Sequence, residues 1–240
     1  MNTRREQTRR RLIVNADDFG ASEGINRGII TAHDEGIVTS TSLMVRMPAT
    51  QHAASLGRER TSLSIGLHID LTGEGTPAPA DINDPAACRN EIRAQVDSFT
   101  ELMQRPPSHL DAHHNIYRRS HLEEVFVELA DELGVPLREH CQVRYFPDFY
   151  GQWDDGETHL EWISPQNLTW MMDHKIGPGI TELSCHPGYV DQALESPYHV
   201  EREAELRSLC DPAVVAHVHR SDFELCNYDD LRHEVMAGVE

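Results

Sequence analysis

The chain has 240 residues, enough for one large α/β domain with a full hydrophobic core or for two small domains. Apolar residues make up 39% and charged residues 25%, which excludes a disordered chain and is ordinary for a soluble globular protein. The formal net charge of −19 repels phosphate backbones, so we expect no nucleic-acid partner and favour a neutral substrate.

Residues 1–11 form a basic segment, which we expect to be a flexible tail ahead of a single domain over residues 12–240. The segment is rich in arginine, but no apolar stretch follows that would make it a secretory signal. No run of apolar residues is long enough to cross a bilayer. We therefore expect a cytoplasmic protein that does not bind membranes.

Apolar strand patterns alternate with helical patterns along the chain, which predicts a parallel α/β fold. We expect strands at 12–14, 38–45, 63–69, 180–185 and 214–218, and a short strand that opens at Leu110. Ser22 is placed to cap a helix that runs to about Asp34. Residues 123–133 have amphipathic helical spacing and are followed by Gly134 and Pro136. No linker divides the chain, so we expect one domain.

Four apolar strand patterns end in acidic or imidazole residues. They lie at 14–20, 66–70, 109–114 and 182–188. The carboxyl ends of parallel strands meet at one face, where active sites lie, so these segments are expected to form one site. Imidazole and carboxylate groups suit a divalent metal ion, and three protein ligands leave a position open for water. The pattern therefore predicts a catalytic metal site.

The adjacent Asp17 and Asp18 can take two roles, one toward the metal and one toward the water that the metal activates. A lone Asp-Asp pair would be explained as well by a turn or a helix cap. His68 lies in an apolar run and, taken alone, could be a buried core histidine. His186 precedes Pro187 and could simply belong to a turn. The joint occurrence of these signals favours a metal-dependent hydrolase.

The motifs resemble the YdjC-like carbohydrate deacetylase family. The matching stretches are Asn-Ala-Asp-Asp-Phe-Gly at 15–20, Gly-Leu-His-Ile-Asp-Leu-Thr at 66–72, His-Leu-Asp-Ala-His at 109–113 and Ser-Cys-His-Pro-Gly-Tyr at 184–189. Their order and rough spacing match through most of the chain, and 227–231 resembles the family's C-terminal segment. The resemblance implies a distorted (β/α) TIM-like barrel of seven parallel strands, related to the polysaccharide deacetylases.

The resemblance also implies one divalent metal ion, Mg²⁺ or Zn²⁺, and hydrolysis of an N-acetyl group on a sugar. Carried over onto this chain, the metal ligands are Asp18, His68 and His113, the general base is Asp17 and the general acid is His186. Family members often have further histidines after the Asp-x-His motif. Here Asn115 and Tyr117 stand at those positions, so the contacts to the sugar are expected to differ.

Six of the fifteen aromatic residues lie between Tyr145 and Trp162. Aromatic rings offer apolar faces to the C–H faces of sugars. The same cluster could instead be a buried patch or the interface of a homo-oligomer, and both alternatives stay open. We predict a small neutral N-acetylated sugar as substrate, most simply a chito-oligosaccharide such as a disaccharide of N-acetylglucosamine. The residues predicted to contact it are His114, Asn115, Tyr150 and Trp153.

Two other functions would use parts of the same pattern. A metallophosphoesterase or nuclease would be expected to hold two metal ions beside a basic pocket, which the acidic chain disfavours. A non-catalytic carbohydrate-binding or metal-storage protein would not need the paired Asp17 and Asp18.

Overall fold

The computed structural model describes residues 9–73, 77–153, 156–190 and 196–230. Within these residues, seven strands form one sheet in the order β4-β3-β2-β1-β8-β5, with β9 beside β1, and every pairing is parallel. The strands are β1 (Arg10–Phe19), β2 (Ser40–Leu43), β3 (Ser64–Ile69), β4 (Leu110–Ala112), β5 (Arg144–Phe146), β8 (Gly179–Cys185) and β9 (Phe223–Leu225). The predicted α/β fold with seven parallel strands is confirmed.

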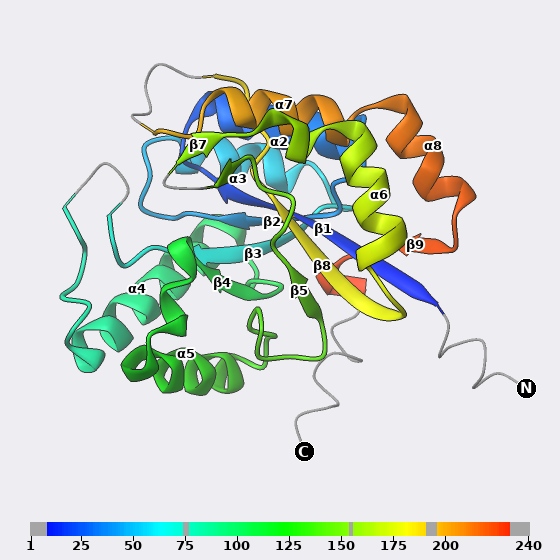
Figure 1. Cartoon of the computed structure of the whole chain (residues 1–240). Helices are drawn as coiled ribbons and strands as arrows, with labels where there is room; N and C mark the ends of the chain where they lie inside the picture. Colours follow the sequence, from blue (N-terminus) through cyan, green and yellow to red (C-terminus); the bar gives the residue numbers. More distant parts are fainter. Residues whose placement is uncertain (1–8, 74–76, 154–155, 191–195, 231–240) are drawn as a thin grey trace, which may run out of the picture.

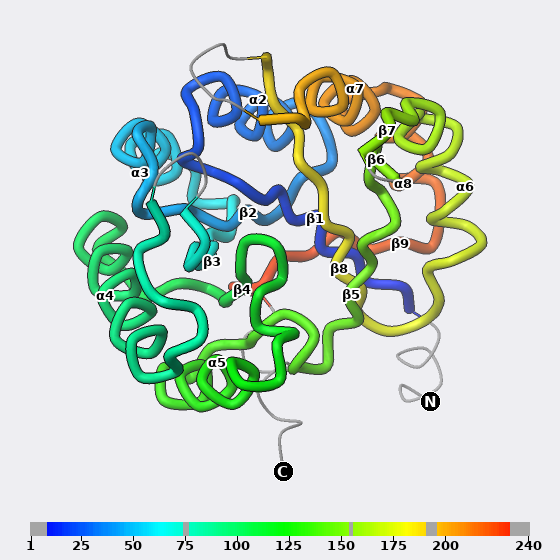
Figure 2. The backbone as a smooth tube through the Cα atoms, turned by 60° about the vertical axis from the view of Figure 1, so that its left-hand side comes forward, coloured from blue at the N-terminus to red at the C-terminus, as the bar shows by residue number. Residues whose placement is uncertain are grey.

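The sheet curves into a half-barrel, and the helices surround it on the outside (Figure 1, Figure 2). Beyond β4 the sheet is extended by residues 136–138, where the Leu110 N–H donates to the Pro136 carbonyl and the Arg138 N–H donates to the Leu110 carbonyl. The helices are α2 (Glu23–Asp34), α3 (Thr50–Arg58), α4 (Pro85–Met103), α5 (Ser120–Leu133), α6 (Pro165–Lys175), α7 (Val200–Leu209) and α8 (Pro212–Arg220), with 3-10 turns η1 (His113–Arg118) and η2 (Leu160–Ile163). A separate antiparallel hairpin consists of β6 (Gln152–Trp153) and β7 (Glu157–Thr158).

The central strand β1 shows how the sequence separates the core from the site. Leu12 and Val14 point outward into the main hydrophobic core beneath the helices. Ile13, which alternates with them, packs inside the barrel in a smaller apolar cluster with Tyr228. Farther along β1 the side chains become acidic. The interior is therefore apolar at one end of the barrel and polar where the strands finish.

The expected strand at 214–218 is wrong, because these residues lie in α8. The Asp211 side chain accepts a hydrogen bond from the Ala213 N–H and caps this helix, and a proline occupies its first turn. Val214 and Val218 are four residues apart and both buried, which fits one face of a helix as well as a short strand. The last strand of the sheet follows α8 as β9.

The start of β1 differs from its predicted position, whereas the start of α2 agrees with the prediction. β1 begins at Arg10, inside the stretch predicted to be a tail, and the Arg10 guanidinium pairs with Asp222 and lies 4.0 Å from the Phe223 ring centroid. Residues 1–8 of that stretch lie outside the described residues. The Ser22 cap of α2 is confirmed, since its side chain accepts a hydrogen bond from the Ile25 N–H. Among the described residues, no helix combines the length and apolar character needed to span a membrane.

Candidate active site

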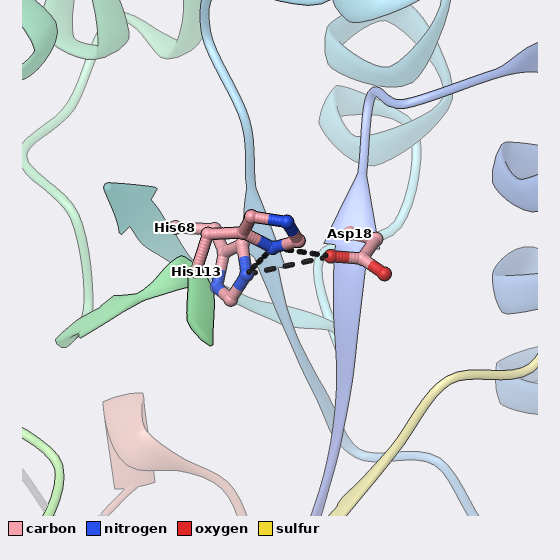
Figure 3. Close-up of side chains that lie close together, drawn as sticks. All are labelled: Asp18, His68 and His113. Atoms are coloured by element: carbon pink, nitrogen blue, oxygen red, sulfur yellow. Dashed lines mark hydrogen bonds and ion pairs between the residues drawn. The ribbon is translucent and has the colours of Figure 1, made fainter. Parts of the chain in front are cut away.

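Asp18, His68 and His113 meet at the ends of β1, β3 and β4, and their side chains point toward one another (Figure 3). Asp18 Oδ1 lies 3.4 Å from His68 Nε2 and 3.3 Å from His113 Nδ1, and these two nitrogens are 3.3 Å apart. Donor atoms that each lie about 2.0–2.1 Å from a tetrahedral ion are about 3.3–3.4 Å apart. Within the described part of the chain, the buried Asp18 Oδ1 has no hydrogen-bond partner. The three side chains therefore fit a divalent metal ion.

The backbone of β1 explains how two adjacent aspartates reach one pocket. In a regular strand their side chains would point to opposite faces. The pairing of β1 with β2 shifts register between Ala16 and Phe19, and Asp18 has a φ of 69°. Aspartate tolerates this left-handed conformation better than most residues do. As a result both Asp17 and Asp18 line the same cavity.

Asp111 orients His68. His68 Nδ1 lies 2.7 Å from Asp111 Oδ1, and a proton held there leaves the Nε2 lone pair free to face an ion. Burial lowers the pKa of His68, but the Asp111 and Asp18 carboxylates outweigh burial and hold it well above the usual range. Sequence reasoning did not assign Asp111 a role, although it lies in the quoted His-Leu-Asp-Ala-His motif two residues before His113.

Arg138 holds Asp17 in place. Its guanidinium donates to both carboxylate oxygens of Asp17, at 2.8 and 2.7 Å, and the Asn15 amide donates to Asp17 Oδ1 at 2.8 Å. Burial raises the pKa of Asp17, but the neighbouring Arg138 guanidinium outweighs it, so the pKa lies below the usual range. Asp17 is therefore an oriented, ionised carboxylate. No motif surrounds Arg138 in the sequence, so nothing there marked it as part of the site.

A second group of possible ligands, Asp17, His68 and Asp111, lies beside the first. Arg138 Nη2 lies 2.7 Å from Asp17 Oδ1 and 2.8 Å from Asp111 Oδ2, so the guanidinium already neutralises this group. Arg138 also donates to Glu182 at 2.6 Å. The single positive charge of Arg138 thus forms ion pairs with three buried carboxylates, those of Asp17, Asp111 and Glu182. Among the described residues this leaves one Asp/His group open to a metal ion.

The C-terminal motif at 227–231 contacts the carboxylates around Arg138 through Tyr228. The Tyr228 hydroxyl donates to Glu182 Oε2 at 2.6 Å. His109 stacks on the Tyr228 ring with a centroid distance of 4.0 Å. Burial lowers the pKa of His109 to about 4, so its imidazole is a neutral part of the barrel interior. Leu231, the last residue of that motif, lies outside the described residues.

His186 follows β8 and faces the pocket from the side of Asp17. Its Nε2 lies 3.9 Å from Asp17 Oδ2. Burial lowers the pKa of His186 to about 4, so the imidazole is neutral at pH 7. The two side chains predicted to act as acid and base are thus neighbours across the pocket.

Helix α7 contacts both the His186 backbone and Asp18, a role the sequence did not reveal. Arg202 donates to Asp18 Oδ2 at 2.6 Å and to the His186 carbonyl at 3.4 Å. The Glu205 carboxylate accepts hydrogen bonds from the His186 backbone N–H and from the Tyr198 hydroxyl. Burial raises the pKa of Glu205 to about 8. Nothing in the local sequence of α7 distinguishes these residues from an ordinary charged helix surface.

A cavity of about 320 Å³ opens above these groups. It is lined by all nine residues that the sequence predicted for the site: Asp17, Asp18, His68, His113, His114, Asn115, Tyr150, Trp153 and His186. His114 and Asn115 adopt left-handed conformations, with φ of 56° and 47°. Tyr117 is buried, and its hydroxyl donates to Asn115 at 2.9 Å, which fixes that side chain. The cavity is also lined by Tyr145, which belongs to the aromatic cluster noted in the sequence, and by Ser184 and Tyr198, which sequence reasoning did not assign to the site.

The chain is similar to several known proteins. The sequence pattern of the family described as YdjC-like protein matches residues 11–220. A relative from Clostridium beijerinckii named carbohydrate deacetylase is 33% identical over 248 residues, covering 92% of this chain and 100% of the relative.

Two solved structures show related folds. The crystal structure of an Enterococcus faecalis V583 protein, described as a candidate cellobiose-phosphate cleavage protein, has a TM-score of 0.76 and 27% identity and covers 93% of this chain and 99% of its own. A Streptococcus mutans CE4 esterase has a TM-score of 0.60 at 11% identity, covering 93% of this chain and 88% of its own, and shares the fold. The chain belongs to the YdjC-like family of carbohydrate deacetylases and carries a candidate Asp/His metal site in a CE4-like distorted barrel.

Proposed function

We propose that the protein is a metal-dependent hydrolase that removes the N-acetyl group from a short, neutral amino sugar, with chito-oligosaccharides as the first choice. The observation that carries the proposal is the joint placement of two groups in one cavity. The Asp18, His68 and His113 ligand set lies beside the Asp17 and His186 pair. The family relationship supports a carbohydrate as substrate.

Asp18, His68 and His113 would hold the ion, which when bound supplies Lewis-acid polarisation of the acetamide carbonyl and acidifies water. Asp17 is placed to take the proton from the attacking water at Oδ2. Arg138 keeps this carboxylate ionised and aimed into the cavity, since it binds both oxygens. Asp17 is therefore the general base in our proposal.

His186 is the proposed general acid. An amide nitrogen is a poor leaving group, so the amine must gain a proton as it departs. With a pKa of about 4, His186 enters the reaction neutral. Its Nε2 lies 3.9 Å from Asp17 Oδ2, which is longer than a hydrogen bond, so in our proposal the proton taken by Asp17 passes through one bridging water to Nε2 and then to the amine. The proton that leaves the attacking water would thus be carried first by Asp17 and then by His186.

The charge of the cavity favours a neutral substrate over a phosphate ester. Arg202 is the only lysine or arginine among the described residues that line it. Its guanidinium is committed to Asp18 and to the carbonyls of Tyr198 and His186. A two-metal phosphoesterase is also disfavoured, because Arg138 occupies the second carboxylate group.

The test is acetate release from N-acetylglucosamine and its di- and trisaccharides after loading with Zn²⁺ or Mg²⁺. Polymeric chitin, an acetylated lysine peptide and a phosphorylated N-acetylated disaccharide serve as comparisons. We expect the neutral short sugars to react fastest, and metal analysis to give one ion per chain. Preference for the peptide or the polymer, or two ions per chain, would contradict the proposal. A preference for the phosphorylated sugar would refute its neutral-substrate part.

Gly28→Ala offers a test of the loop that carries His186. A Cβ on Gly28 would lie 2.5 Å from the Cα of Gly188, two residues after His186, and 2.9 Å from the Tyr189 nitrogen. Alanine favours helices over glycine, so the change in α2 would be stabilising if the loop did not lie there. We expect the loop to be pushed outward and kcat to fall by about 10²-fold, as misplacement of a catalytic group by about 1 Å can cause.

Arg27→Ala on the exposed side of α2 is the matched control and should leave activity unchanged. Thermal melting and metal content are measured alongside the rate. Wild-type kcat together with a raised melting temperature in Gly28→Ala would show that the loop is not held against α2.

A further inference from the structure

All three tryptophans of the chain lie on its surface. Trp153, Trp162 and Trp170 are 37%, 44% and 48% exposed. Tryptophan is highly buried on average in folded proteins, so the exposure of every tryptophan in a chain calls for a ligand or a partner. They come from β6, η2 and α6, which are close together in the chain, and β6 and α6 lie on the same side of the molecule (Figure 2). We call these three residues the tryptophan strip.

The strip is continuous with the proposed active site. Trp153 lines the catalytic cavity, and its indole N–H donates to the Tyr150 carbonyl at 2.8 Å, which fixes the ring. The ring centroid of Trp162 lies 5.8 Å from that of Trp153. Trp162 and Trp170 both line a second hollow of about 310 Å³ on the surface. A ligand that leaves the catalytic cavity over Trp153 therefore meets Trp162 next.

The second hollow has the mixed lining that a sugar ring requires. The Trp162 and Trp170 rings supply apolar faces, while Glu161, Asn167 and Lys175 supply hydrogen-bonding groups. His174 stacks on Trp170 with a centroid distance of 5.0 Å and an interplanar angle of 16°. This stacking supports the Trp170 ring, and the Lys175 ammonium lies 5.9 Å from the ring centroid. The ring is still nearly half exposed, so part of it remains open to a ligand.

We propose that the tryptophan strip binds further rings of the substrate oligosaccharide, beyond the ring held at the metal site. The inference rests on the proposed function and sharpens it, since the preferred substrate becomes a chain of more than two sugar rings. Continuity with the catalytic cavity favours this occupant over a protein partner, because a bound chain would occupy both hollows at once. Each ring packs its C–H face on an indole.

Trp162→Ala and Trp170→Ala test the strip. Each should lower kcat/KM for the tetrasaccharide of N-acetylglucosamine by about fivefold to tenfold, as loss of one stacking contact predicts. Each should leave kcat/KM for the disaccharide within about twofold of wild type, because the short substrate would not reach these rings. Leu160→Ala is the matched control, since Leu160 is 40% exposed on the same turn but does not line the hollow.

Binding is measured separately from turnover. Calorimetric titration of the metal-loaded Asp17→Asn protein with the tetrasaccharide and the disaccharide should give tighter binding of the tetrasaccharide. Trp170→Ala in that background should narrow the difference, and Trp162→Ala together with Trp170→Ala should remove it. Equal binding of both sugars, or loss of both in the tryptophan variants, would overturn the inference. A change in oligomeric mass by light scattering, with chain-length preference intact, would identify the strip as a subunit contact and also overturn it.

The two proposals fail in different ways. If no sugar releases acetate but the tetrasaccharide still binds more tightly than the disaccharide, the strip stands and the proposed reaction is wrong. If the disaccharide and the tetrasaccharide react and bind equally well, the reaction stands and the strip is wrong.

Discussion

Asp17→Asn is expected to lower kcat by about 10² to 10⁴-fold while the metal ion stays bound. Asparagine has nearly the same shape as aspartate but cannot take a proton from water. The proposed metal ligands are unchanged, and Arg138 keeps its contacts with Asp111 and Glu182. Acetate release and metal content are measured on the same preparation. Retention of wild-type kcat would show that another group is the base.

His186→Ala serves as the companion variant. It should retain the metal as well, and its defect should shrink on substrates with a better leaving group, because proton donation to the amine then matters less. Asp17→Asn should show no such dependence. A defect of equal size on all leaving groups in both variants would remove the distinction between base and acid.

Asp18→Asn is expected to reduce metal affinity and activity together. It replaces an anionic ligand with a neutral amide, and it deprives Arg202 of the carboxylate that it contacts at 2.6 Å. The buried guanidinium of Arg202 then lies beside the ligand set without that partner, which further disfavours a cation.

The measurement is metal content after dialysis, followed by activity as Zn²⁺ or Mg²⁺ is added back. Activity should return only at metal concentrations well above those needed by the wild type. His68→Ala, which removes a ligand without disturbing Arg202, should show the same pattern. Metal loss in Asp17→Asn equal to that in Asp18→Asn would show that the two aspartates do not divide their roles as proposed.

The sequence predicted the site best where candidate site residues stand directly after an apolar strand pattern. The strand ends that carry Asp18, His68 and His113 could be identified because an apolar run followed by acid or imidazole is an unusual pattern. Parallel topology then requires that such ends converge. For this reason Asp17, Asp18, His68, His113 and His186 line one cavity. Tyr150 and Trp153, which the aromatic cluster suggested, line the same cavity without lying at the end of a strand of the parallel sheet.

The residues that support the site were missed because their partners are distant in sequence. Arg138 meets Asp17 across 121 positions, and Arg202 meets Asp18 across 184. A single charged residue in a loop or on a helix has no local feature that reports a buried carboxylate elsewhere. The strand expected at 214–218 failed for a related reason: two valines four residues apart suit either element, and the Asp211 cap was overlooked.

The position of β1 in the sheet has a consequence for how the chain folds. The first residues of the domain pair with nearly the last, since Arg10 lies opposite Gly179 of β8 and Phe223 of β9. Contacts of such sequence separation form slowly, because a long loop must close first. During synthesis, the apolar strand at the start of the domain must wait for most of the chain before it is covered on both edges. Chaperone capture or aggregation of the nascent protein should therefore depend on Leu12, Ile13 and Val14 more than on any later strand.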